Sequence, residues 1–230
     1  MRRQDGFTLI EIAIVLVIIG LLLGGVLKGQ ELITSARVRN IISTQDGIKA
    51  SYFGFQDRYR ALPGDYPGAQ AFANIPNMVD ATMGGNGDGR IITDGTANEQ
   101  TLAWMHLSHA GFLTGNYSMA IPLEAASTTN TPTNPYNALM QIIHDNAYPV
   151  IAPETASVRI NVKTGNQIPV DILTEMDRKV DDANAARGTF RFSAFAGVGA
   201  APDPATCFTA GTGVWLTTSN QVNCGGLTLF

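Results

Sequence analysis

An apolar run near the N-terminus constrains this chain more than any other feature. Its 21 residues, from Phe7 to Leu27, contain one charged residue, Glu11, and one other polar residue, Thr8. As a helix, the run would span about 30 Å, which is the thickness of the hydrocarbon core of a bilayer. A charge placed in hydrocarbon costs roughly 2.5–3.5 kcal/mol, so a carboxylate in such a run usually marks a function.

The residues on either side of the run indicate how it would be inserted. Arg2 and Arg3 precede it, so the short N-terminus is expected to stay in the cytoplasm while the rest of the chain faces outward. A cleaved secretory signal has a shorter apolar core and a small-residue cleavage site, and residues 26–30 (VLKGQ) offer no such site. A plain signal anchor is the remaining alternative, with Glu11 reaching the cytoplasmic interface.

The run is entered through the segment GFTLIE, residues 6–11. This segment resembles the processing site of type IV prepilins and of the pseudopilins of type II secretion. That site has a short basic leader ending in glycine, then an aromatic or apolar residue, with glutamate as the fifth residue after the cut. Gly6-Phe7-Thr8-Leu9-Ile10-Glu11 matches each position. The resemblance implies that a membrane-embedded prepilin peptidase removes leader 1–6 by cutting after Gly6, and that the same enzyme N-methylates Phe7.

The expected cut gives Glu11 a partner. It creates an ammonium group at Phe7, four residues before Glu11 and therefore on the same side of a helix. An ammonium and a carboxylate attract strongly in a medium of low dielectric constant, where each alone is penalised. The pair could form within one subunit or between two. The resemblance implies the second arrangement, in which Glu11 of an incoming subunit meets Phe7 of a subunit already docked.

The resemblance also implies partners and a location. The chain is expected to be a structural subunit of a pilus or pseudopilus filament, with other pilin or pseudopilin subunits, the prepilin peptidase, an inner-membrane assembly platform and membrane lipid as its partners. It would first be a single-pass protein of a bacterial inner membrane, with its head in the periplasm. One position departs from the family: major pilins often carry a proline 22 residues after the cut, where this chain has Lys28. This departure favours a minor pilin or a pseudopilin.

The periodicity predicts that the helix continues beyond the membrane. Apolar or aromatic residues recur three to seven positions apart as far as residue 60, at Ile41, Ile48, Tyr52, Phe55 and Tyr59. Pro63-Gly64 then predicts a turn. We therefore expect a membrane-spanning half at 7–27, an amphipathic half at 28–60 and a globular head at 61–230. The expected fold class is α+β, a long helix packed against an antiparallel β-sheet head as in pilins.

Within the head, two helices and three strands are predicted. Residues 98–115 and 168–188 have helical periodicity, and Pro169 suits the start of the second helix. Partial alternation predicts strands at Val158–Val162, Thr189–Phe195 and Gly213–Thr217.

Cys207 and Cys224 are the two cysteines of the chain. From the residues alone, they would form a disulfide outside the cytoplasm and remain free thiols inside it. The resemblance favours the disulfide, because the C-terminal region of a pilin head is closed by one.

A glycine-rich segment, GGNGDGRIITDG at residues 84–95, imitates the centre of a calcium-binding loop, in which alternating oxygen donors surround the ion. Asn86, Asp88 and Asp94 are the predicted ligands of a Ca²⁺ ion, and Asp80 or Glu99 could complete the set. Glycines stand where such a loop has its first Asp and its closing Glu, so a plain turn is the alternative.

Composition and motifs exclude other classes. The formal net charge of −4 gives no reason to expect binding to nucleic acid. The sequence has no nucleophile elbow, phosphate loop or dinucleotide fingerprint, so we expect no enzyme. The alternative function is a membrane-anchored, calcium-dependent binding module that does not polymerise.

Overall fold

The structure is a computed structural model that describes residues 9–230. The chain divides into two compact units, the first ending at Arg37 and the second spanning Val38–Phe230. The predicted leader and the predicted cleavage site at Gly6 and Phe7 lie outside the described residues. The second unit is called the head below.

The first helix, α1, runs from Leu9 to Tyr59, through glycines at positions 20, 24 and 25. Its predicted end is confirmed, since Arg60 adopts a left-handed conformation (φ 54°) and Pro63 follows. Buried side chains begin at Val38 and recur at Ile41, Ile48 and Phe55, as the periodicity predicts. The amphipathic half of the helix therefore belongs to the head from residue 38 onward.

The head contains a four-stranded antiparallel sheet in the order β1-β2-β4-β3. Its strands are β1 (Gln141–Asp145), β2 (Arg159–Lys163), β3 (Phe190–Phe192) and β4 (Gly226–Leu229). The predicted strands at Val158–Val162 and Thr189–Phe195 are confirmed as β2 and β3. The prediction of a strand at Gly213–Thr217 was wrong: Val214 and Trp215 make only isolated bridges, and Thr217 starts a short 3₁₀ helix, η1 (Thr217–Ser219).

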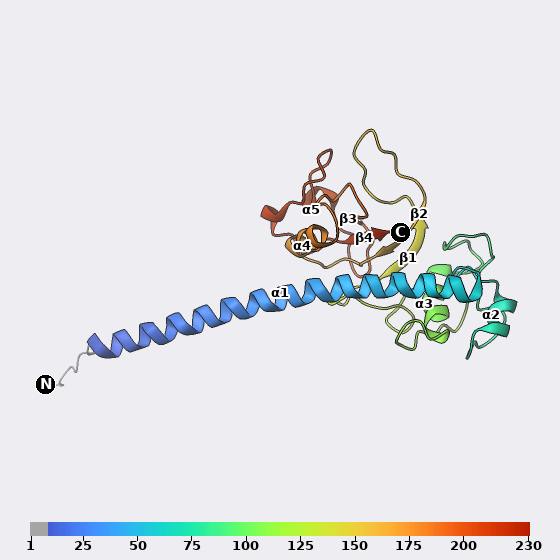
Figure 1. The fold of residues 1–230 in the computed structure, drawn as a ribbon, viewed down its shortest axis with the longest axis horizontal. Helices are drawn as coiled ribbons and strands as arrows, with labels where there is room; N and C mark the ends of the chain where they lie inside the picture. Colours follow the sequence, from blue (N-terminus) through green and yellow to red (C-terminus); the bar gives the residue numbers. More distant parts are fainter. Residues whose placement is uncertain (1–8) are drawn as a thin grey trace. The chain divides into compact units, whose positions relative to one another are not determined.

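The register separates the two faces of the sheet. Ile142, Val162, Thr228 and Phe190 form one cross-strand row. Ile142 and Val162 pack in one core cluster with Ile48, Tyr52 and Phe55 of α1, and Phe190 packs in a second with Val38 and Ile41. This face of the sheet therefore packs against the part of α1 within the head, as expected for an α+β pilin-like fold (Figure 1).

The remaining helices cover the rest of the core. They are α2 (Gly68–Asn74), α3 (Glu99–His109), α4 (Val170–Val180) and α5 (Pro204–Cys207). The two predicted head helices are confirmed as α3 and α4. Trp104 of α3 is buried in the cluster that contains Phe55, whereas Met176 of α4 is buried in the cluster that contains Val38.

A disulfide joins Cys207 and Cys224, which confirms the predicted pairing. Both sulfur-bearing residues are fully buried and pack in the same cluster as Val38 and Ile41 of α1. The disulfide thus closes the C-terminal region directly beside the place where α1 enters the head.

Candidate functional site

The N-terminal part of α1, from Leu9 to Leu27, presents its apolar side chains to the outside all around the helix. Leu9 is 90% exposed, and the large hydrophobic residues that follow are each about half exposed or more. By length and composition this helix can cross a membrane, although no membrane is present in the structure. A surface of this kind is stable in water only when lipid or protein covers it.

Glu11 lies in the first turn of α1, where a negative charge is favoured by the helix dipole. It is exposed, and every described residue from Leu9 to Lys28 is exposed with it. Its predicted partner, the amine of Phe7, lies outside the described residues. The assembly role of Glu11 therefore stays a prediction.

A second site is the glycine-rich loop of the head, whose backbone is held by side chains. The seven consecutive amides from Asn86 to Ile92 each donate a hydrogen bond to a side-chain acceptor. Asp65 accepts three of them, from residues 87, 88 and 89, at 2.7–3.0 Å. Glu99 accepts the first and the last, at 3.1 and 3.0 Å. Two carboxylates from outside the loop thus determine its shape.

The two carboxylates come from elements that flank the loop. Asp65 lies in the turn after α1, and Glu99 is the first residue of α3. Glu99 is fully buried and Asp65 is 4% exposed. Burial raises the pKa of Glu99 to about 7, although the amides of Ile92 and Asn86 oppose the shift. Burial also raises the pKa of Asp65, against the opposing effect of the amides of Gly89 and Gly87.

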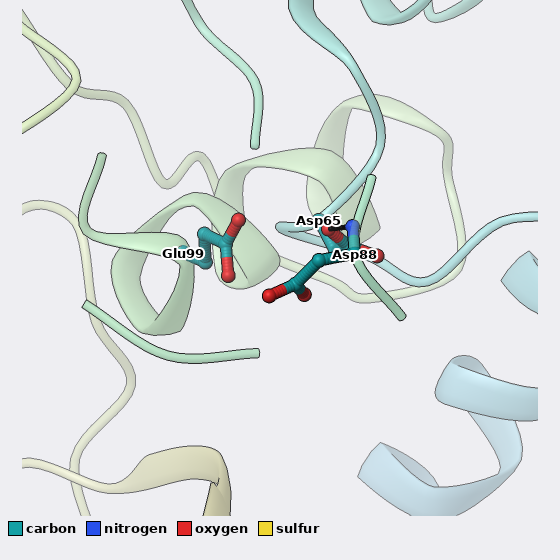
Figure 2. Close-up of side chains that lie close together, drawn as sticks. All are labelled: Asp65, Asp88 and Glu99. Carbon is teal, nitrogen blue, oxygen red and sulfur yellow. Dashed lines mark hydrogen bonds between the residues drawn. The ribbon is translucent and has the colours of Figure 1, made fainter. Parts of the chain in front are cut away.

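The side chain of Asp88 extends toward Glu99, and Asp65 lies beside the backbone of Asp88 (Figure 2). One carboxylate oxygen from each of Asp65, Asp88 and Glu99 lies within 4.8 Å of the others. Carboxylate oxygens are the ligands that Ca²⁺ prefers, so the donor set has suitable chemistry. The same three groups repel one another when ionised, and their closeness adds to the raised pKa of Glu99.

The predicted calcium ligands are only partly brought together. Asp88 joins Asp65 and Glu99, of which Glu99 was a suggested addition and Asp65 was not predicted. Asp94 instead accepts hydrogen bonds from Thr96 and from the side-chain amide of Asn86, at 2.8 Å from the latter. The bonds from Thr96 hold the pKa of Asp94 well below its usual range. Calcium binding itself stays a prediction.

Asp65 had no signal of its own in the sequence. It belongs to the segment LPGD, which reads as a turn, and it lies 23 residues before Asp88. The turn reaches the loop only in the folded chain. It is held in place by a hydrogen bond from the amide of Gly64, next to Asp65, to Nδ1 of His106 at 3.0 Å. His106 is fully buried, and burial lowers its pKa to about 4, so it stays neutral as an acceptor at neutral pH.

Comparison with known proteins identifies the N-terminal segment. Residues 1–27 match the family model of the prokaryotic N-terminal methylation motif, which is the signature of type IV prepilins and pseudopilins. The chain therefore carries the prepilin signature at the position where the sequence resembles a processing site. No curated protein and no solved structure matches the chain.

Proposed function

We propose that the protein is a type IV pilin-like structural subunit that is processed by a prepilin peptidase and assembled into a pilus or pseudopilus filament. One observation carries the proposal. The methylation motif of residues 1–27 includes, from Leu9 onward, a helix segment that is apolar and exposed all around, and the same helix continues at Val38 into a packed, disulfide-closed head. Such a segment needs a covering, and neighbouring copies of the same segment can supply it.

In this proposal, lipid covers the exposed segment first and other subunits cover it later. The peptidase cuts after Gly6, and the new amine of Phe7 is methylated. Glu11 of an entering subunit pairs with that amine on a subunit already in the filament. The pair fixes the axial register because the two charges are each costly in an apolar surrounding unless they meet.

The first test is the N-terminus of the mature protein. Mass spectrometry of the protein purified from membranes should show a chain that begins with N-methylated Phe7. An intact Met1 would instead fit a membrane-anchored module that does not polymerise, and a cut beyond Gly25 would fit secretion.

The second test is assembly by the Glu11→Ala variant. We expect the variant to be processed like the wild type and to be absent from the sheared filament fraction, a loss of at least about tenfold, because a buried amine without its partner is strongly unfavourable. Glu31→Ala is the matched control, since Glu31 is an exposed glutamate of the same helix that pairs with Lys28 at 2.6 Å. Normal filaments from Glu11→Ala would contradict the proposed role.

A further inference from the structure

The connection between β1 and β2, residues 146–158, lies on the face of the sheet opposite to α1 (yellow in Figure 1). We call it the strap. The register places Lys163, Leu227 and Arg191 in one cross-strand row that alternates with the row facing α1. Leu227 and its neighbour on this face, Leu229, form a small buried cluster with Tyr148 of the strap. The strap is therefore the cover of this face.

The strongest contact of the strap is to Arg191 of β3. Its guanidinium donates from Nη1 to the carbonyl oxygen of Pro149 at 3.2 Å and from Nη2 to Oε1 of Glu154 at 2.8 Å. It also lies over the ring of Tyr148, 5.2 Å from the ring centroid. Nε donates to the carbonyl oxygen of Gly188, which holds the arginine to its own end of the sheet. One side chain thus joins three points of the strap to β3.

The two ends of the strap are held separately. The hydroxyl of Tyr148 donates to the carbonyl oxygen of Ser157 at 2.6 Å and accepts from the amide of Ser157 at 3.2 Å. At the root, Asp145 is bound by the ammonium of Lys163 and by Nδ2 of Asn161. The Tyr148–Ser157 bonds thus join the two ends of the strap to each other, and the Asp145 contacts fix its root. The middle is held by Arg191 and by the packing of Ile151.

Besides Arg191, the interior of the strap has one contact with the larger core: Ile151 packs, partly buried, against the cluster that contains Val38 and Ile41. The strap contains no helix or strand, and its described backbone hydrogen bonds include only one within the strap itself, from the amide of Glu154 to the carbonyl oxygen of Ile151. The Tyr148 cluster is also separate from the two larger core clusters that contain α1. Segments with few buried contacts and few backbone hydrogen bonds open at a lower free energy than the core.

Opening of the strap would also leave the charges of Arg191 and Glu154 in water and not buried without a partner. The Arg191 side chain is 5% exposed and that of Glu154 is 44% exposed. If the strap lifts from the sheet, both groups reach water, so neither is left as an unpaired buried charge, which is the outcome that makes breaking a buried pair costly. The half-exposed carboxylate also leaves the pair open to screening by salt.

We propose that the strap, residues 146–158, acts as a lid. It is held shut by the pair of Arg191 and Glu154, and it opens without unfolding of the rest of the head. Opening uncovers Leu227 and Leu229 on the outer face of the sheet. The lid opens more often at high ionic strength, because salt weakens the ion pair between Arg191 and Glu154. This is a conformational device of the head, and it does not depend on filament assembly.

The experiment is thiol labelling of a Leu227→Cys variant of the full-length protein in detergent micelles, because Leu227 is fully buried in the Tyr148 cluster and is reached only when the strap opens. The thiol at position 227 should be labelled at least about tenfold faster than that of a Leu102→Cys reference, which is buried in the larger core. In the same background, Glu154→Gln should speed labelling at position 227 about tenfold more, leave the reference unchanged, and abolish the acceleration caused by about 0.5 M salt.

Glu175→Gln is the matched control, because Glu175 also pairs with a cation, Lys179, but on the surface of α4. It should leave the labelling at position 227 unchanged. The proposal is overturned if position 227 is labelled no faster than the Leu102→Cys reference, or if Glu154→Gln leaves its labelling unchanged.

Discussion

The two parts of α1 belong to one continuous helix yet have opposite surroundings. From Leu9 to Leu27 every residue is exposed and nearly every one is apolar. From Val38 to Tyr59, one face of the helix is buried in the head, through residues such as Ile41, Ile48 and Phe55, while most charged residues are exposed. The first part is apolar all around, so it needs a covering of lipid or protein on every side. In the second, the covering consists of residues that lie up to about 190 positions later in the chain.

This difference shows that one continuous helix can be adapted to two different environments. A segment that is apolar on every side is suited to lipid or to other helices, and a segment with one apolar face is suited to packing against a sheet. The change occurs near Arg37, where the two units of the chain meet in sequence. Substitutions on the two sides of this point should therefore differ in kind, and the following predictions test the difference.

The largest expected effect on stability comes from Phe55. Its ring is fully buried and lies 4.6 Å from that of Tyr59 and 6.1 Å from that of His106. Phe55→Ala should destabilise the head by about 3–5 kcal/mol, because it leaves a large cavity in the core. Denaturant unfolding of the protein in detergent, followed by tryptophan fluorescence, measures the change.

Leu22→Ala is the counterpart on the other side of Arg37. Leu22 is 64% exposed, so its truncation should leave the stability of the head unchanged. A loss of head stability in Leu22→Ala comparable to that in Phe55→Ala would break the distinction between the two parts of the helix.

Removal of the disulfide should have the next largest effect. The double variant Cys207→Ala, Cys224→Ala should lose about 2–4 kcal/mol, because the unfolded chain gains the freedom of an open loop. The bond lies in the cluster of Val38 and Ile41, so amide exchange near Ile41 should increase more than exchange near Phe55. Equal increases near Ile41 and near Phe55 would show that the two clusters unfold together, and that the disulfide does not stabilise the part of α1 around Ile41 in particular.

The smallest effect is a pH dependence that arises from Asp177 of α4. This carboxyl is fully buried, accepts hydrogen bonds from Nε1 of Trp215 at 2.7 Å and from the amide of Ala183 at 3.2 Å, and lies near Asp182 and Asp181. Burial raises its pKa to about 6, with the two neighbouring aspartates adding to the shift.

Because the folded state holds this proton more tightly than the unfolded state, the contribution of Asp177 to stability is complete below about pH 4 and is lost as the pH rises through about 6. Asp177→Asn should therefore flatten the fall in unfolding free energy between pH 4 and 6.5, by up to about 2 kcal/mol. Parallel pH profiles for the variant and the wild type would contradict a protonated Asp177 in the fold.

The sequence predicted the elements that have a clear period and missed those that do not. The buried positions of α1, such as Ile41 and Phe55, follow helical spacing, and a proline-glycine turn marks the end of the helix. β1 was missed because its two isoleucines, Ile142 and Ile143, are adjacent and show no alternation. β4 was missed because its four residues hold a single polar position, Thr228 between Leu227 and Leu229. The segment Gly213–Thr217 does alternate, but Gly213 has a φ of 73° and the chain there bridges to Asn184 and Phe208 instead of joining the sheet.

The candidate sites likewise could be predicted only where their residues form a pattern that is local in the sequence. The prepilin signature is local in sequence, so Glu11 and the predicted cleavage position could be identified from the sequence alone. The calcium-like loop is local only in part, because Asp88 lies within it while Asp65 reaches it through the fold. Long-range contacts of this kind leave no spacing in the sequence, and a single buried aspartate in a turn looks like any other turn residue.

The place of β4 in the sheet has a consequence for biosynthesis. β4 lies between β2 and β3, and the ring of Phe230, directly after it, packs 5.3 Å from that of Tyr52 on α1. The sheet therefore cannot close until residues 226–229 have been synthesised, whereas α1 is synthesised first. During translation, the apolar face of α1 within the head has to wait for the strand that completes its cover.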